Sequence, residues 1–366
     1  MKNPKSKIYS AGWMLGLLIV FASPFPKDKP KISQSEAMQR FWKRQQDCVE
    51  KEPNKVFSEW RHGFDPSSYP SESAISFLSA WKVTGKKEYL RSAIRQLEFA
   101  HNLENRYHLL PQHQDKPFVA RISQARLCIG YVVAYFVVKD KLWISRADDA
   151  FEGLLLLKQT KVRWKNQEYQ VFYHGYQPNP PFAPISKTFL NPNQDAAVGL
   201  CATLLYHIPK SRFFQKSNLA KIAHNSLDAS IALQNEYGTF PEAQTELDHI
   251  DTRYGHHTLF WIFWANTYWK EKTYDYALRK SLPWIVRYTQ KGTTLRYAPN
   301  FYDGQMPDPP ELWCRLPILY YYKQDLRMWK ITMKRLWQDW EDFADFPGGF
   351  VAPICVLDEM KIPRDL

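Results

Sequence analysis

A single pattern occurs five times along this chain: an aromatic-rich loop leads into a short polar cluster, and the cluster leads into a strongly apolar segment. Each apolar segment is followed by a short connector and a second, more amphipathic segment. A helix that is apolar all round must be buried all round, whereas an amphipathic helix needs cover on one face. The pattern therefore predicts consecutive helical hairpins in two layers, with apolar inner helices and amphipathic outer helices.

The predicted hairpins pair residues 74–83 with 89–102, 122–138 with 142–157, 196–206 with 217–234, 257–269 with 274–288, and 313–322 with 326–340, after a leading helix at 36–52. Their spacing varies from roughly 51 to 71 residues, which is too irregular for a solenoid of fixed repeats. We therefore predict an all-α fold, an (α/α)n toroid of about 10–12 helices built from consecutive hairpins.

The direction of the inner helices predicts where a functional site lies. In a closed ring of such hairpins all inner helices run the same way, so their N-termini and the long loops before them meet at one end. We call this end the mouth. The connectors that lead to it are about 20 to 35 residues long, and loops of that length are usually functional or disordered.

The N-terminus resembles an export signal. Residues 1–22 combine a basic start, with Lys2, Lys5 and Lys7, and an apolar stretch from Ala11 to Phe21 that is short for a membrane-spanning helix. We expect a signal peptide or, alternatively, an uncleaved signal-anchor, then a Pro/Lys-rich tether at 23–35 and a single toroid domain at 36–366. The expected location is outside the cytoplasm, in the periplasm or cell envelope.

The net charge of the chain indicates which partners to expect. The full chain carries a net charge of +12, and loss of residues 1–22 leaves 46 basic and 37 acidic residues. A basic exported protein commonly meets anionic polymers, so we expect an anionic polysaccharide or oligosaccharide as partner and no nucleic acid.

The five cysteines form no Cys-x-x-Cys pair. Cys128 and Cys201 lie inside apolar segments and are expected in the core, and one disulfide is possible.

The densest polar cluster, residues 248–257, precedes the fourth inner helix. Tyr254 or His256 could accept a proton, and Arg253 could neutralise a substrate carboxylate, as the first step of uronate elimination or epimerisation requires. Helix capping is an equal alternative. A metal site built from this cluster matches no motif of defined geometry, so no metal is expected. No cofactor is expected either, because phosphate-binding glycine loops and dinucleotide fingerprints are missing from the sequence.

Asp195, at the start of the third inner helix, is the second catalytic candidate. It could serve as a glycosidase carboxylate with a second acid such as Glu242, Asp303 or Glu311, or it could cap its helix. The remaining candidates are polar or aromatic residues expected near the mouth as substrate-binding groups, namely Glu72, Arg121, Tyr173, His174, Tyr176, Asn191, Asn193, His257, Tyr302, Glu311, Trp313 and Arg315.

The architecture resembles the α/α-toroid carbohydrate-active enzymes. A fainter resemblance to the C-terminal domain of glucuronyl C5-epimerases rests on residues 124–155, 172–178, 189–200 and 253–258. It implies roles for Tyr173, Tyr176 and Tyr254, whereas His174 and Gly175 replace glutamates usual in that family. The hypothesis is an exported enzyme that acts on a uronate-containing polysaccharide as a lyase or epimerase. The alternatives are a glycoside hydrolase using Asp195 and a non-catalytic envelope protein that binds glycan or protein.

Overall fold

The computed structural model describes residues 87–111, 118–185, 187–247 and 252–291, together with residues 71, 74, 75, 77, 78, 81, 82, 85 and 318. This part of the chain contains seven named helices and two small antiparallel sheets. The predicted leading helix, the tether and most of the fifth hairpin lie outside it, although Ile318 of that hairpin is helical and buried.

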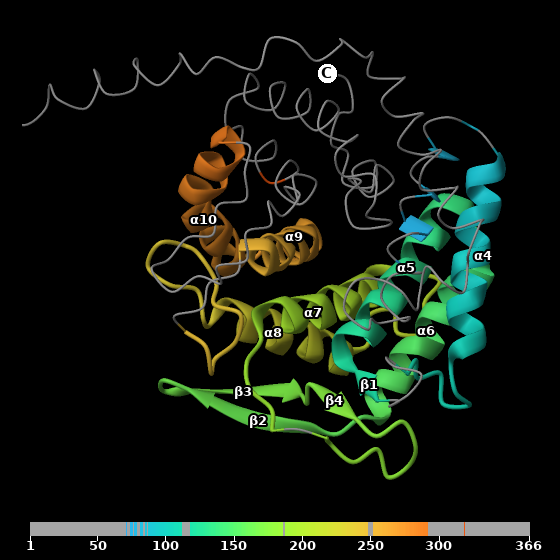
Figure 1. The fold of residues 1–366 in the computed structure, drawn as a ribbon, viewed down its shortest axis with the longest axis horizontal. Helices are drawn as coiled ribbons and strands as arrows, with labels where there is room; N and C mark the ends of the chain where they lie inside the picture. The colour runs from blue at the N-terminus through green and yellow to red at the C-terminus, as the bar shows by residue number, and fades with distance from the viewer. Residues whose placement is uncertain are drawn as a thin grey trace, which may run out of the picture.

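Three inner helices form the centre of the fold: α5 (Arg121–Val138), α7 (Pro192–His207) and α9 (Thr252–Trp269). Fourteen of the 18 residues of α5 and 14 of the 16 residues of α7 are buried. Helix α7 packs against both α5 and α9, and Figure 1 shows the three in succession across the molecule. These helices are the apolar segments of the sequence pattern, buried on all sides as predicted.

The second, more amphipathic segments of the sequence pattern form four outer helices: α4 (Lys87–Leu103), α6 (Lys141–Leu156), α8 (Ser217–Ile231) and α10 (Lys272–Lys291). Only 6 of 17 residues in α4 and 6 of 15 in α8 are buried. Helix α6 packs on α5, α8 on α7 and α10 on α9, so the second, third and fourth predicted hairpins are present.

The turns inside the hairpins explain why each helix ends where it does. Lys139 ends α5 in the left-handed conformation, at φ 64°, and the Asp140 side chain then accepts a hydrogen bond from the Leu142 amide to begin α6. In the first hairpin Gly85 has φ +69°, and its amide donates to the Trp81 carbonyl over 2.7 Å. Gly85 therefore takes the helix-ending role that the sequence predicted for it.

Two short sheets were not predicted. Strand β1 (Val119–Ala120) pairs with β4 (Gly175–Tyr176), and β2 (Gln159–Trp164) pairs with β3 (Gln167–Phe172). The β2–β3 hairpin buries one face against α8, in a small core cluster formed by Val162, Tyr169, Val171, Leu190, Ala229 and Leu233. The sequence predicted this segment as part of a long connecting loop, and the predicted all-α fold class is unaffected by the hairpin.

Helix α5 is the one described helix long and apolar enough to cross a membrane. It is also an inner helix, with 72% of its apolar window buried inside the protein. Its composition therefore follows from its place in the core.

Candidate functional site

The N-termini of α5 and α7 meet, as the sequence predicted for neighbouring inner helices. At one end of the fold Arg121, the first residue of α5, pairs with Asp195 in the first turns of α7. At the other end the Trp269 indole of α9 donates to the Thr203 hydroxyl near the C-terminus of α7, over 2.7 Å. Helices α5, α7 and α9 therefore run parallel, and the mouth is the end that carries Arg121 and Asp195.

Arg121 ties this end of the fold together and is completely buried. Its Nη1 lies 2.8 Å from Asp195 Oδ1 and donates to the Phe172 carbonyl over 2.5 Å. Its Nε donates to Gln194 Oε1 over 3.0 Å, and its Nη2 to the Phe189 carbonyl over 3.5 Å. The guanidinium thus joins α5, α7, the end of β3 and the loop before α7. Arg121 was predicted to bind substrate, but a ligand would have to displace these partners to reach it.

Asp195 is 2% exposed and engaged through both carboxylate oxygens. Oδ1 faces Arg121, and Oδ2 accepts a hydrogen bond from the Asn191 amide over 2.8 Å. The Asn191 side chain in turn accepts from the Gln194 amide over 3.1 Å, as a helix N-cap does. Burial raises the pKa of Asp195 to about 6, against the opposing effects of the Arg121 charge and the Asn191 amide. Asn191 is therefore the residue that caps α7, whereas Asp195 binds the Asn191 amide and forms a buried ion pair with Arg121.

The turn between β3 and β4 carries three predicted residues in different settings. Tyr176 is fully buried, and its hydroxyl donates to the Lys158 carbonyl and accepts from the Tyr173 amide, over 2.6 and 2.7 Å. Both hydrogen-bonding roles of that hydroxyl are therefore used inside the protein. Tyr173 is half-buried and packs its ring edge-on against Tyr176. Of these two tyrosines, Tyr173 is the one placed to meet a ligand.

His174, the third residue of this turn, is held from two sides. Its ring stacks on Phe189 with centroids 6.2 Å apart and hydrogen-bonds to the Gln194 side chain. Burial and the Arg121 charge lower the pKa of His174, so the imidazole is neutral near pH 7. Its Nδ1 is buried and has no hydrogen-bond partner among the described residues. A neutral, oriented imidazole with an unused nitrogen has the properties of a general base.

Asn193 supplies a second unused polar atom at the same end. It lies in the first turn of α7 and is 5% exposed. Within the described part of the chain, nothing hydrogen-bonds to its Oδ1. Buried polar atoms normally have a partner, so the Asn193 oxygen, like His174 Nδ1, is an atom to which a ligand or water could hydrogen-bond.

The start of α9 only partly matches the predicted chemical centre. Tyr254 and His257 are half-buried, and the His257 ring lies 6.3 Å from that of Trp261. His256 is 1% exposed and stacks on Trp284 of the outer helix α10, with centroids 4.7 Å apart. His256 therefore faces the outer layer and packs there, away from the position expected of a proton acceptor.

Several predicted residues lie outside the described part of the chain. Arg253 is the second residue of α9, but its side chain is not described. All atoms of the remaining ones lie outside it too, namely those of Glu72, Tyr302, Glu311, Trp313 and Arg315. Asp248 and Asp251, the two acidic residues of the 248–257 cluster considered for a metal site, also lie outside the described part of the chain. Among the described residues, no three His, Cys, Asp or Glu side chains are grouped as a metal site would require.

Sequence reasoning overlooked Gln194 and Phe189, the two residues that hold His174. Gln194 belongs to a polar cluster that the sequence did single out, so its position was a usable signal. Phe189 is one aromatic among many in the long loops, and nothing local marks it as a partner of a histidine 15 residues earlier.

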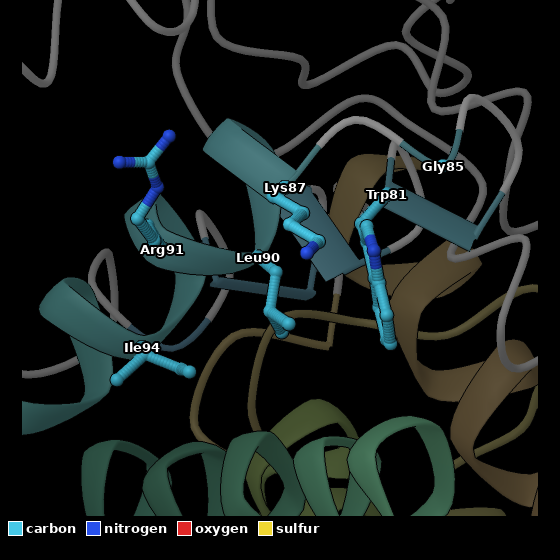
Figure 2. Close-up of a pocket in the computed structure, with 6 residues that line it drawn as sticks. All are labelled: Trp81, Gly85, Lys87, Leu90, Arg91 and Ile94. Atoms are coloured by element: carbon cyan, nitrogen blue, oxygen red, sulfur yellow. The ribbon is translucent and has the colours of Figure 1, made fainter.

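A pocket of about 530 Å³ lies elsewhere, beside the outer helix α4 (Figure 2). Its wall is formed by Trp81, Leu90 and Ile94, whose side chains point the same way, whereas the Arg91 guanidinium points away from them. Sugars are held through hydrogen bonds to their hydroxyl groups as well as through stacking. A lining this apolar suits a sugar less well than the mouth does.

No protein-family model matches the sequence, and no curated protein matches it. Solved structures do share its fold. Cellobiose 2-epimerase from Spirochaeta thermophila aligns with a TM-score of 0.56 and 10% identity over 86% of this chain and 87% of its own. A family 76 glycoside hydrolase from a bovine Bacteroides thetaiotaomicron strain gives 0.57 and 10% over 85% and 69%. A polysaccharide lyase gives 0.51 and 14% over 84% of each chain.

The shared fold confirms the predicted helical fold class, and the named neighbours are carbohydrate-active enzymes. Their reactions differ among themselves, and their identity to this chain is low. The likeness therefore establishes the fold, while any activity has to be argued from the residues at the mouth.

Proposed function

We propose that this protein is a carbohydrate-active enzyme that binds a uronate-containing polysaccharide at the mouth and abstracts a proton from it, as lyases and epimerases do. The observation that carries the proposal is the neutral, oriented imidazole of His174 at the end where the inner helices begin. The fold supports it, since structural neighbours include a sugar epimerase and a polysaccharide lyase by name.

His174 and Tyr254 are the two proton-transfer groups in this proposal. Gln194 and Phe189 fix the His174 ring, and Arg121 beneath it opposes protonation at rest. Proton abstraction beside a carboxylate builds negative charge, so it needs a cation or hydrogen-bond donors near the sugar. Arg253 is the proposed cation, because the Arg121 charge is already paired with Asp195. Tyr254, half-buried in the first turn of α9, is the proposed proton donor on the opposite side of the sugar.

The hydrolase alternative is less well supported. A glycosidase needs two carboxyl groups that reach the scissile bond, one as acid and one as base or nucleophile. Asp195 is buried, with one oxygen held by Arg121 and the other by the Asn191 amide. To attack a sugar it would have to give up the interactions that join α5 to α7.

A second candidate function is glycan binding without catalysis. It is favoured by the internal pairing of Arg121 with Asp195, which leaves the charged groups of the described mouth engaged with each other. Half-buried Tyr173 and the unused Asn193 oxygen would then serve as stacking and hydrogen-bonding groups.

We also propose that the protein is exported, as its N-terminal sequence predicts.

The test uses the full chain and a panel of uronate oligosaccharides and their neutral counterparts in deuterated water. Proton abstraction predicts deuterium at carbon 5 of the sugar, or an unsaturated product that absorbs in the ultraviolet. His174→Gln and Tyr254→Phe should lower turnover by about a hundredfold or more while binding persists. Tyr237→Phe, at an exposed loop residue, is the matched control.

Binding without exchange in the unaltered protein would support the second candidate and reject the enzyme. Full turnover in His174→Gln would reject the role of His174. If the protein neither binds nor turns over any member of the panel, the carbohydrate proposal as a whole is rejected.

A further inference from the structure

Two thiols face each other in the inner layer, away from the mouth. Arg121 of α5 donates to Gln194 of α7 over 3.0 Å, and Cys128 and Cys201 follow these two residues by seven positions each, which is about two helical turns. Because the two helices pack on each other, this spacing places the two thiols on facing sides, and the Cys128 thiol also lies 3.5 Å from the Ala147 carbonyl. Both residues are buried, with exposed fractions of 1% and 0%, and both are free thiols in this structure. The sequence marked each as a core residue but could not show that they meet, because 72 residues separate them.

We propose that Cys128 and Cys201 form a disulfide that covalently joins α5 to α7. A disulfide needs two short side chains whose backbones approach within about 4.4–6.8 Å between Cα atoms. Helices α5 and α7 pack directly on each other, and Cys128 and Cys201 occupy facing positions in that contact. Closing the bond requires the two sulfur atoms to come within about 2.05 Å of each other, while the helices keep their order and direction.

The reaction is an ordinary two-electron oxidation. Each thiol loses one proton and one electron, the sulfur–sulfur bond forms, and the electrons pass to the disulfide of oxidised glutathione or of a thiol–disulfide oxidoreductase, which is reduced to two thiols. The attacking group must be a thiolate, and burial raises the pKa of the Cys128 thiol. We therefore expect the bond to form while the inner helices are still assembling. The same burial then shields it from reductants.

The bond would sit behind the mouth. Cys128 follows Arg121 by seven residues and Cys201 follows Asp195 by six, which places the sulfur atoms about 10 Å along the helices from the ion pair. The two helices that frame His174 and Asn193 would thus be joined twice, by charge at the mouth and by a covalent bond further in. This inference does not depend on the proposed carbohydrate function.

The test refolds the full chain from denaturant with a mixture of oxidised and reduced glutathione. The remaining cysteines, Cys48, Cys314 and Cys355, lie outside the described residues and are replaced by alanine, so that any internal disulfide must join Cys128 to Cys201. After unfolding without reductant, the monomer should react with no alkylating reagent, and its intact mass should lie about 2 Da below that of the reduced chain.

Two further measurements guard against a variant that fails to fold. The unaltered chain, refolded in the same way and digested without reduction, should yield one peptide that links Cys128 to Cys201. Cys128→Ala in the unaltered chain should abolish that peptide and lower the midpoint of thermal unfolding measured under oxidising conditions. The inference is overturned if both thiols of the refolded protein alkylate, or if the linked peptide joins either cysteine to a different one.

Discussion

Replacing Asp195 by alanine separates the structural and catalytic interpretations of the mouth. The change removes the acceptor for Arg121 Nη1, which lies 2.8 Å away, and the acceptor for the Asn191 amide. Arg121 keeps the Phe172 and Phe189 carbonyls and the Gln194 side chain. Its positive charge then remains completely buried and without a counter-ion.

The magnitude follows from that uncompensated charge. Breaking a buried ion pair by removing one partner costs about 3–5 kcal/mol, which lowers the ratio of folded to unfolded protein by roughly two to four orders of magnitude. The guanidinium cannot relieve the cost by losing its proton. Asp195→Ala should therefore destabilise the protein at any ordinary pH.

The reverse substitution behaves differently, and the difference is diagnostic. In Arg121→Met the Asp195 carboxyl can take up a proton, and its pKa is already raised to about 6 by burial. Arg121→Met should therefore be milder in acid than at neutral pH. The double substitution should restore part of the stability lost in Asp195→Ala, because it leaves no buried charge.

Urea unfolding followed by tryptophan fluorescence measures all three variants. The matched control is Asp149→Ala, which removes one of the two carboxylates paired with the more exposed Arg212 and should cost less than about 1 kcal/mol. A loss below about 1 kcal/mol for Asp195→Ala, together with loss of turnover, would refute the structural reasoning. Catalytic carboxylates commonly leave stability unchanged or improved when they are removed.

Three further predictions concern stability. The pKa of Asp195 lies near 6 in the folded protein, above its unfolded value near 4. The stability that this pKa difference contributes is therefore present below about pH 4 and is lost as pH rises through about 6. The pH dependence of the unfolding free energy should differ between the unaltered protein and Asp195→Asn by up to about 3 kcal/mol. Gly199→Ala should cost about 1–3 kcal/mol in urea titrations, since its new Cβ would lie 2.7 Å from Leu227 Cγ, whereas Gly255→Ala, with no atom nearer than 3.7 Å, should be neutral or stabilising. Tyr176→Phe should cost about 1–3 kcal/mol in the same measurement, because two partly buried hydrogen bonds to the backbone are lost, and an unchanged midpoint would contradict the hydrogen bonds assigned to it.

The helical hairpins could be predicted because burial leaves a direct imprint on sequence. Helices α5 and α7 are buried on all sides, and their residues are apolar on all sides. The helix boundaries were harder to predict, because the polar residues in the first turns of a helix resemble a loop. Helix α9 begins at Thr252, five residues before its predicted start. The β2–β3 hairpin was missed although Val162, Tyr169 and Val171 alternate as strand residues do, since long connectors were taken as loops throughout.

The candidate site was predictable in position and much less so in detail. Sequence order placed polar clusters at inner-helix N-termini, and the structure brings Arg121 together with Asn191 and Asp195 there. Which polar group pairs with which depends on contacts across more than 70 residues, and no local pattern encodes those. His256 illustrates the limit, because its direction is set by Trp284 on a helix that follows it.

The common direction of the inner helices has an electrostatic consequence. The aligned peptide dipoles of a helix leave roughly half a positive charge at its N-terminus, so the parallel starts of α5, α7 and α9 place three such partial charges at one end of the protein. This field belongs to the backbone, and it persists even though Asp195 neutralises Arg121. Added salt screens it over about 8–10 Å, so capture of an anionic sugar should slow as ionic strength rises, whichever side chains line the way.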